Sequence, residues 1–277
     1  MRAERCAAAL AVIAALGGAG AARADSSYLG GFRPVAAEES ARSLWVNPAA
    51  IGIRGVPRAA VDLVWFEQDR LRPGDARRLS IAVSMLDAAY GLQLGLADET
   101  GVPDWTLTWG KRLPVGGALS LGFDVEWRGG EDSAFDGALG ALAARREWSL
   151  GAAVTNLFEP ETQGVPAVRT WQLGVAWRPP SMEGRFTYDA VLPAGADSRH
   201  WFGVAFDRTR RIRLAGALST AGDWNATVDF VLGSHLLGAG ARDPEGGSRR
   251  EFAAWEWTGA QRRQQHGPRT GNPGNRR

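Results

Sequence analysis

The sequence predicts an all-β chain folded as an antiparallel transmembrane β-barrel of about 14 strands, or about 12 if the two weakest do not form. Three observations support this class: alternating apolar segments, long links that alternate with short ones, and tryptophans near the predicted strand ends. In residues 117–127, every second position from Leu119 to Trp127 is apolar. The intervening positions hold small or acidic residues, which is the period of a strand with two unlike faces.

The first 24 residues have the pattern of a secretory signal peptide. A short charged start is followed by an apolar run from Cys6 to Ala22 and by a small-x-small site that ends at Ala24. A transmembrane anchor is the competing interpretation, but an alanine-rich run with a cleavage site favours the signal peptide. Its removal would take away Cys6, the only cysteine. We therefore predict a mature chain without a thiol, a disulfide or a thiolate metal site.

Residues 25–58 are predicted to form a hatch-like segment in front of the barrel. A short helix is expected over residues 37–46. It should end there, because Pro48 disfavours helical geometry at Asn47. No later segment has the length of about 18 apolar residues that a spanning helix needs. If the mature chain crosses a membrane, it does so as strands.

The barrel is predicted over residues 59–258. Alternation places strands at 59–66, 78–86, 89–97, 104–112, 117–128, 134–143, 147–156, 169–178, 184–192, 200–207, 211–219, 223–232, 235–242 and 251–258. Long links follow the first, third, seventh, ninth and thirteenth of these, and short turns lie between them. Outer-membrane barrels have long outer loops and short periplasmic turns, although the link at 220–222 is shorter than this rule expects.

The two faces of the strands differ in chemistry. The apolar face is predicted to meet lipid, and the other face, with its glycine, alanine, serine and charges, to line the lumen. The predicted lumen-facing charges are Asp124, Glu126, Arg178, Arg185, Asp189, Asp207, Arg213 and Asp229.

Tryptophan is frequent, with 12 residues, and indole rings prefer the membrane interface. The predicted interfacial aromatics are Trp65, Trp105, Trp127, Trp148, Trp171, Trp177, Trp201 and Trp224. The alternative is that these rings pack the core of a secreted, soluble β-sandwich that acts as a binding module.

The stretch Asn47-Pro48-Ala49 resembles an element near the start of the outer-membrane long-chain fatty-acid transporter (FadL-like) superfamily and of PorV-type barrels. Residues 151–157, which end in Asn156-Leu157, are similar to a strand of the PorV-type group. The resemblance implies a barrel of 14 strands whose N-terminal segment lies in or beneath it as a hatch. It covers few residues beyond the general pattern.

The chain departs from these families in two ways. It is much shorter than a typical fatty-acid transporter, and residues 259–277 form a polar tail predicted to be disordered. This leaves a further alternative, the N-terminal barrel domain of a longer surface peptidase-like protein that lacks its catalytic part. A serine–lysine dyad here would need Lys111, which is predicted to face outward on a strand.

The sequence thus predicts a small barrel of the bacterial outer membrane, exported by its signal peptide. Its predicted role is passage of hydrophobic compounds or a membrane platform for a partner. Expected partners are outer-membrane lipid and a hydrophobic small molecule or a secretion partner. We predict no enzyme activity, no cofactor, no metal and no nucleic-acid binding, because the three histidines lack ligand spacing and no basic face is interleaved with aromatics.

Overall fold

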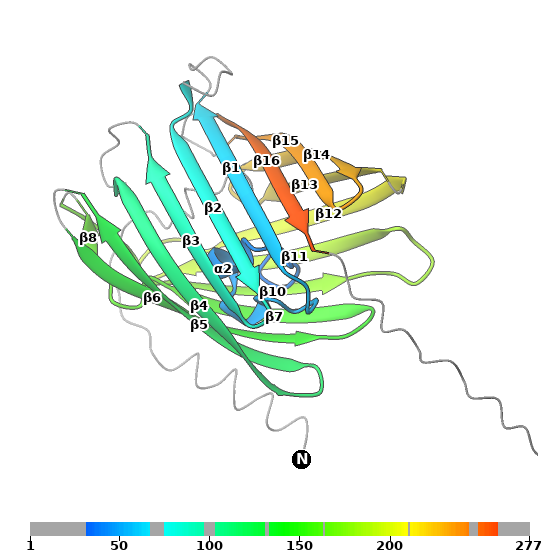
Figure 1. The fold of residues 1–277 in the computed structure, drawn as a ribbon, viewed down its shortest axis with the longest axis horizontal. Coiled ribbons are helices and arrows are strands. Elements are labelled where there is room, and N and C mark those ends of the chain that lie inside the picture. The colour runs from blue at the N-terminus through cyan, green and yellow to red at the C-terminus, as the bar shows by residue number, and fades with distance from the viewer. Residues whose placement is uncertain are drawn as a thin grey trace, which may run out of the picture.

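The computed structural model describes residues 32–66, 75–96, 103–130, 133–162, 164–209, 211–243 and 249–259. The predicted signal peptide and nearly all of the predicted polar tail lie outside these ranges. Strands dominate the described residues (Figure 1). They run Arg58–Phe66 (β1), Arg78–Met85 (β2), Ala88–Gly95 (β3), Trp105–Gly116 (β4), Leu119–Gly129 (β5), Ala134–Ala144 (β6), Trp148–Thr155 (β7), Glu161–Thr162 (β8), Val165–Pro166 (β9), Thr170–Trp177 (β10), Gly184–Pro193 (β11), Arg199–Thr209 (β12), Ile212–Ser219 (β13), Trp224–Leu232 (β14), His235–Asp243 (β15) and Arg250–Thr258 (β16).

Fourteen of these strands form one closed antiparallel barrel, in which each pairs with its neighbours and β1 pairs with β16. Val61 of β1 lies opposite Trp255 of β16 at this seam. The predicted barrel class and its strand count of 14 are confirmed, and the β-sandwich is not what forms. The two-stranded β8–β9 hairpin, which the sequence did not predict, lies in the link between β7 and β10.

One strand end differs clearly from its prediction. Strand β4 continues to Gly116, four residues past the predicted end at 112, because β5 pairs with it down to Leu119. Pro114 would ordinarily interrupt a strand, and the register shifts between Pro114 and Gly116. Such a bulge accommodates proline near a strand end. The other predicted ends fall within two residues of the observed ones.

Alternation decides which side chains face the lumen. On β2, Ser80, Ala82 and Ser84 are fully buried, whereas Ile81 and Met85 are exposed by 37% and 56%. The apolar side chains therefore point away from the barrel interior, the reverse of a water-soluble sheet with one buried apolar face. This arrangement suits a barrel whose outer surface meets lipid.

The two ends of the barrel differ in the links they carry. We call the end with the turns at 86–87, 117–118 and 233–234 the short-turn end, and the opposite end the long-link end. Strand β1 starts and β16 finishes at the short-turn end. Among the described residues, no helix is long and apolar enough to cross a membrane.

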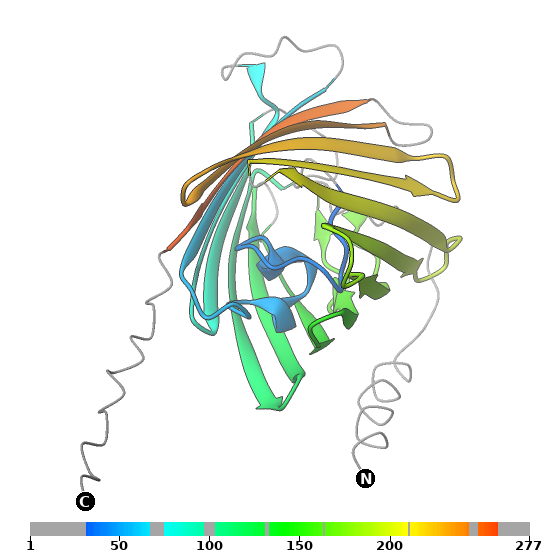
Figure 2. The same cartoon turned by 90° about the vertical axis from the view of Figure 1, so that its right-hand side faces the viewer.

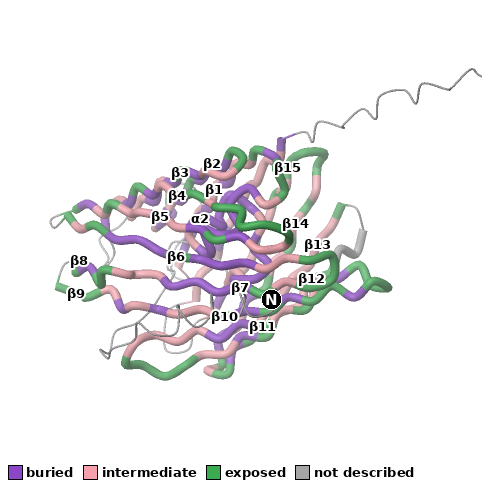
Figure 3. The backbone as a smooth tube through the Cα atoms, turned by 90° about the horizontal axis from the view of Figure 1, so that it is seen from below, coloured by how far each residue is buried: buried purple, intermediate pink, exposed green. Residues whose placement is uncertain are grey.

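Residues 32–57, which we call the inner segment, lie inside the barrel (Figure 2). The segment contains helix α2 (Ser43–Val46) and the 3-10 helix η1 (Pro48–Ala50). Most of its residues are buried, and the region around α2 is almost wholly so (Figure 3). The barrel interior is therefore filled by the chain's own N-terminal region rather than by side chains of the wall alone.

The predicted helix at 37–46 was too long, since only residues 43–46 are α-helical. Before residue 43, a side chain replaces a helical backbone acceptor: the Ser40 N–H donates to the Glu38 carboxylate at 2.8 Å. Such local bonds compete with helix formation. The predicted stop is confirmed, because Asn47 is extended, at φ −156° and ψ 99°.

Substituting a charged residue on the outer face of the barrel tests whether that face meets lipid. Leu173 lies near the middle of β10 and is 37% exposed. Leu173→Arg is expected to lower the free energy of unfolding in lipid vesicles by about 2–4 kcal/mol, because arginine is costly at mid-membrane. Leu173→Ala is the control and should cost clearly less. Equal unfolding midpoints for the two variants in urea would show that this face does not meet lipid.

Candidate functional site: the filled lumen

Glycines on the inner wall allow the inner segment to approach the strands. Gly122 of β5 and Gly140 of β6 lie opposite each other in register. A Cβ atom at Gly122 would overlap the backbone of Pro48 and Ala49, and one at Gly140 would overlap Asn47 Oδ1. The predicted small inner face is confirmed here, and it serves contact with the inner segment rather than approach of opposite walls.

Asn47 fixes the Asn-Pro-Ala turn to this wall. Its side-chain amide donates to the Val35 carbonyl at 3.0 Å and to the Ala141 carbonyl of β6 at 3.2 Å. Its Oδ1 accepts the Ala49 N–H at 3.1 Å, which caps η1. The side chain is fully buried with its donors and acceptor used. The structure thus places the predicted hatch motif inside the lumen, bonded to both the inner segment and the wall.

Arg42 joins the inner segment to the seam of the barrel. Its Nε donates to Asp62 of β1 at 2.6 Å, and its Nη1 donates to Glu256 of β16 at 3.2 Å. Its Nη2 donates to the Trp255 carbonyl at 3.1 Å. The Arg42 and Asp62 side chains are only 2% and 1% exposed. One buried cation therefore bridges the first and last strands.

The charges of the inner segment are matched to their surroundings. Burial lowers the pKa of Arg42, but the charge of Asp62 and the hydrogen bond to it outweigh this, so the pKa lies above its ordinary value. Burial likewise raises the pKa of Glu38, but the charge of Arg33 and the bonds from Ser40 lower it overall. Both groups are therefore charged at neutral pH.

The opposite end of the inner segment is held by an aromatic stack. The Phe32 ring lies parallel to the Trp201 indole, with centroids 4.3 Å apart. The Arg242 guanidinium lies 5.5 Å from the centre of the same indole. Below this stack, Val35 N–H donates to the Asp189 carboxylate at 2.7 Å. Trp201 and Arg242 lie near the long-link ends of their strands, so the inner segment reaches toward that end.

Most predicted lumen-facing charges do face inward. Asp124 and Asp189 are buried. Glu126 pairs with Arg128 of the same strand at 2.9 Å, and Arg128 also reaches Asp136 of β6 at 2.7 Å. These pairs form the charged wall of β5 and β6. Reasoning from the sequence missed Arg42, Asp62, Arg128, Asp136 and Glu256.

The remaining predicted lumen charges gather at the short-turn end. Arg185 and Asp229 line a cavity there, and Arg213 lies opposite Asp229 in register. Arg178 follows the end of β10, so it belongs to a turn at the cavity mouth and not to a strand as predicted. Asp207 lies on β12 opposite Arg213, but its side chain is outside the described part of the structure.

This cavity has a volume of about 710 Å³ and lies between the inner segment and the wall of β11–β16. Its strand residues all lie within four residues of the short-turn end. Some inner positions of this wall are small, and two of them, Ala205 and Ala254, line the cavity. Small side chains leave the space that the inner segment does not fill.

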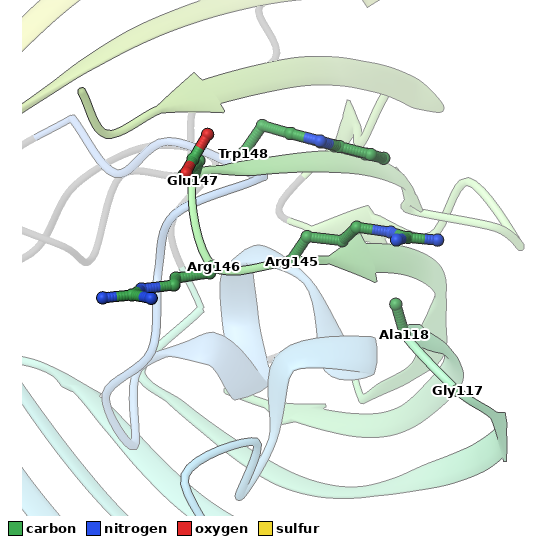
Figure 4. A pocket seen from close by; sticks show the side chains of 6 residues that line it. All are labelled: Gly117, Ala118, Arg145, Arg146, Glu147 and Trp148. Carbon is green, nitrogen blue, oxygen red and sulfur yellow. The ribbon is translucent and has the colours of Figure 1, made fainter. Parts of the chain in front are cut away.

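Six of the eight predicted interfacial tryptophans lie on the outer face at strand ends. They are Trp105, Trp127, Trp171 and Trp224 at the long-link end and Trp148 and Trp177 at the short-turn end. Trp148 and Trp177 lie directly opposite each other on β7 and β10. Beside them the turns at 117–118 and 145–147 enclose a hollow of about 540 Å³, in which Arg145 lies 5.8 Å from the Trp148 ring centre (Figure 4).

Two predicted interfacial tryptophans are corrected. Trp201 faces the lumen, since it lies opposite the inward Asp189 and shares a face with Gly203. The two-residue spacing of Trp201 and Gly203 in the sequence already indicates this shared face. Trp65 lies on the outer face but is only 6% exposed.

No protein-family model and no curated protein matches this chain. Among solved structures, it is similar to a triple mutant of the Rhodopseudomonas blastica porin, with 9% identity and a TM-score of 0.45, over 73% of this chain and 98% of that chain. Another mutant of that porin gives 8% identity and a TM-score of 0.43 over the same shares. These values are too low to assign a family. The FadL-like and PorV-type resemblance stays a prediction.

Proposed function

We propose that this chain is an outer-membrane β-barrel that passes small polar solutes, with the inner segment as the plug that limits passage. The observation that carries the proposal is the closed barrel with an apolar outer face and a polar interior filled by residues 32–57. Closure pairs the backbone N–H and C=O groups of every strand with those of a neighbouring strand, as is required of strands that cross a membrane.

The interior favours polar over hydrophobic solutes. The wall next to the inner segment carries buried Asp124, Asp136 and Asp189, and the cavity at the short-turn end is lined by charged side chains. A hydrophobic compound would remove these groups from water without replacing their hydrogen bonds, which costs free energy. The polar interior therefore favours passage of polar solutes over passage of hydrophobic compounds, which was one of the predictions from the sequence.

A platform for a partner is the second candidate function. The β4–β5 hairpin exposes Leu113 and Val115, by 45% and 58%, at the short-turn end. Apolar side chains at the tip of a hairpin are suited to contact with another protein. This role does not require an open lumen.

Deleting residues 25–56 from the mature chain is expected to raise single-channel conductance in a planar bilayer several-fold. Without the inner segment, Asp62 and Glu256 face water in the open lumen rather than a dry interface, so the barrel tolerates the loss. The matched control is a deletion of residues 260–277, which should leave conductance unchanged. Equal conductance of the first deletion and the full mature chain would contradict the plug and favour the platform.

A further inference from the structure

The inner segment covers one side of the lumen wall and leaves another side open. Its helix α2 lies against β3 and β4, and η1 lies against β4, β5 and β6 (Figure 2). On the covered side, the inward alanines Ala82 of β2 and Ala89 of β3 are 0% exposed. On β13, Ala215 and Ala217 also point inward, since Ala215 lies opposite Ala205 of the cavity lining, yet both are partly exposed. Open lumen space therefore lies beside β13.

This open space forms a strip along β12–β15. It begins at the cavity of the short-turn end, which Arg213 and Asp229 line. From there toward the long-link end, the next inward positions of these strands are small and partly exposed: Gly203, Ala205, Ala215, Ala217, Thr227 and Gly240. Small side chains leave room between this wall and the inner segment, so the strip leads from the cavity toward the long-link end.

A buried layer closes the strip at the long-link end. Its wall residues are each at most 8% exposed: Trp201, Ser219, Asp223, Asn225 and Arg242. The inner segment adds one ring to this layer, because Phe32 stacks on the Trp201 indole at an interplanar angle of 8°. The Arg242 guanidinium lies 5.5 Å from the centre of the same indole. The closure is thus shared between the wall and the inner segment.

Phe32 lies outside the anchored part of the inner segment. The hydrogen bonds that hold this segment to the wall begin at Val35 and continue at Arg42 and Asn47. An aromatic pair is a small contact beside these bonds. The Phe32 ring can therefore leave Trp201 while the rest of the inner segment stays in place.

We propose that Phe32, Trp201 and Arg242 form the gate of a solute path that runs along the inner face of β12–β15. In the closed state the stacked rings block the long-link end of the strip. Separation of Phe32 from Trp201 opens it without removal of the inner segment. The gate rests on the proposed function, passage of small polar solutes, and assigns that passage to one side of the lumen.

The path is tested by thiol labelling of the full mature chain, residues 25–277, which contains no cysteine of its own. Ala217→Cys places a thiol in the open strip, and Ala82→Cys is the matched control under the inner segment. In detergent, a small charged methanethiosulfonate reagent should label Ala217→Cys at least about tenfold faster, because a buried thiol reacts only after local opening. Equal labelling rates would overturn the path.

The gate is tested by single-channel conductance in a planar bilayer. Phe32→Ala and Trp201→Ala should each raise conductance to a value between those of the full mature chain and the deletion lacking residues 25–56. The control is Trp224→Ala, because Trp224 lies at the same end but on the outer face, and it should leave conductance unchanged. If Trp201→Ala fails to give the heat-modifiable band of a folded barrel, Phe32→Ala decides the outcome.

The deletion separates failure of the gate from failure of passage. If it raises conductance while Phe32→Ala and Trp201→Ala match Trp224→Ala, the gate is overturned and the plug remains. If conductance is unchanged in every variant, including the deletion, passage is contradicted and the gate falls with it. A rise in both gate variants, with none in Trp224→Ala, supports the gate.

Discussion

Arg42→Gln is expected to lower the free energy of unfolding by about 3–5 kcal/mol, which is the usual cost of removing one partner of a buried ion pair. Glutamine cannot neutralise Asp62, whose side chain is 1% exposed, and cannot reach both Asp62 and Glu256. Asp62 would then lose its guanidinium partner at the seam between β1 and β16, whereas Glu256 would keep Arg58 at 3.0 Å. The measurement is urea unfolding in lipid vesicles, followed by tryptophan fluorescence.

Arg54→Gln provides the matched control. Arg54 also pairs with a carboxylate, but its side chain and that of Glu39 are 45% and 34% exposed. Exposed pairs contribute at most about 1 kcal/mol. Adding Asp62→Asn to Arg42→Gln should recover part of the loss, since it removes the uncompensated charge. Equal unfolding midpoints for Arg42→Gln and Arg54→Gln would show that the seam does not depend on Arg42.

Gly140→Leu is expected to displace the Asn-Pro-Ala turn from the wall and to raise conductance toward that of the deletion lacking residues 25–56. Any side chain at Gly140 overlaps Asn47 Oδ1, and the nearby Pro48 and Ala49 leave no room for it to turn aside. The overlap is with a buried, fully bonded group, so relief requires movement of the inner segment. Limited proteolysis should also cut the inner segment faster.

The control is Gly216→Leu on β13. A Cβ atom there meets only the Asn225 carbonyl, at an ordinary 3.6 Å, and Gly216 lies opposite Val204 on the outer face. This variant should keep the conductance and protease resistance of the unchanged chain. If Gly140→Leu behaves in the same way, the inner segment does not depend on close contact with β6.

The strands were predictable because their signal is local. On β2 and β10, the alternation of apolar with small residues places every second side chain on one face whatever the rest of the fold does. The helix at 37–46 was overestimated because a local bond from the Ser40 N–H to the Glu38 carboxylate replaces helical bonds, and periodicity does not report such bonds. Trp201 was misplaced because its type was weighed above its shared face with Gly203.

The residues that share a strand face and the stop at Asn47 were predictable from the sequence, since each depends on neighbours along the chain, whereas 14 strands rather than 12 followed only from closure of the barrel. The contacts inside the lumen could not be predicted in this way. Arg42 and Glu256 lie 214 residues apart and touch because β1 closes on β16 and residues 32–57 enter the barrel. Such contacts depend on closure and on the path of the inner segment, and neither leaves a periodic trace in the sequence.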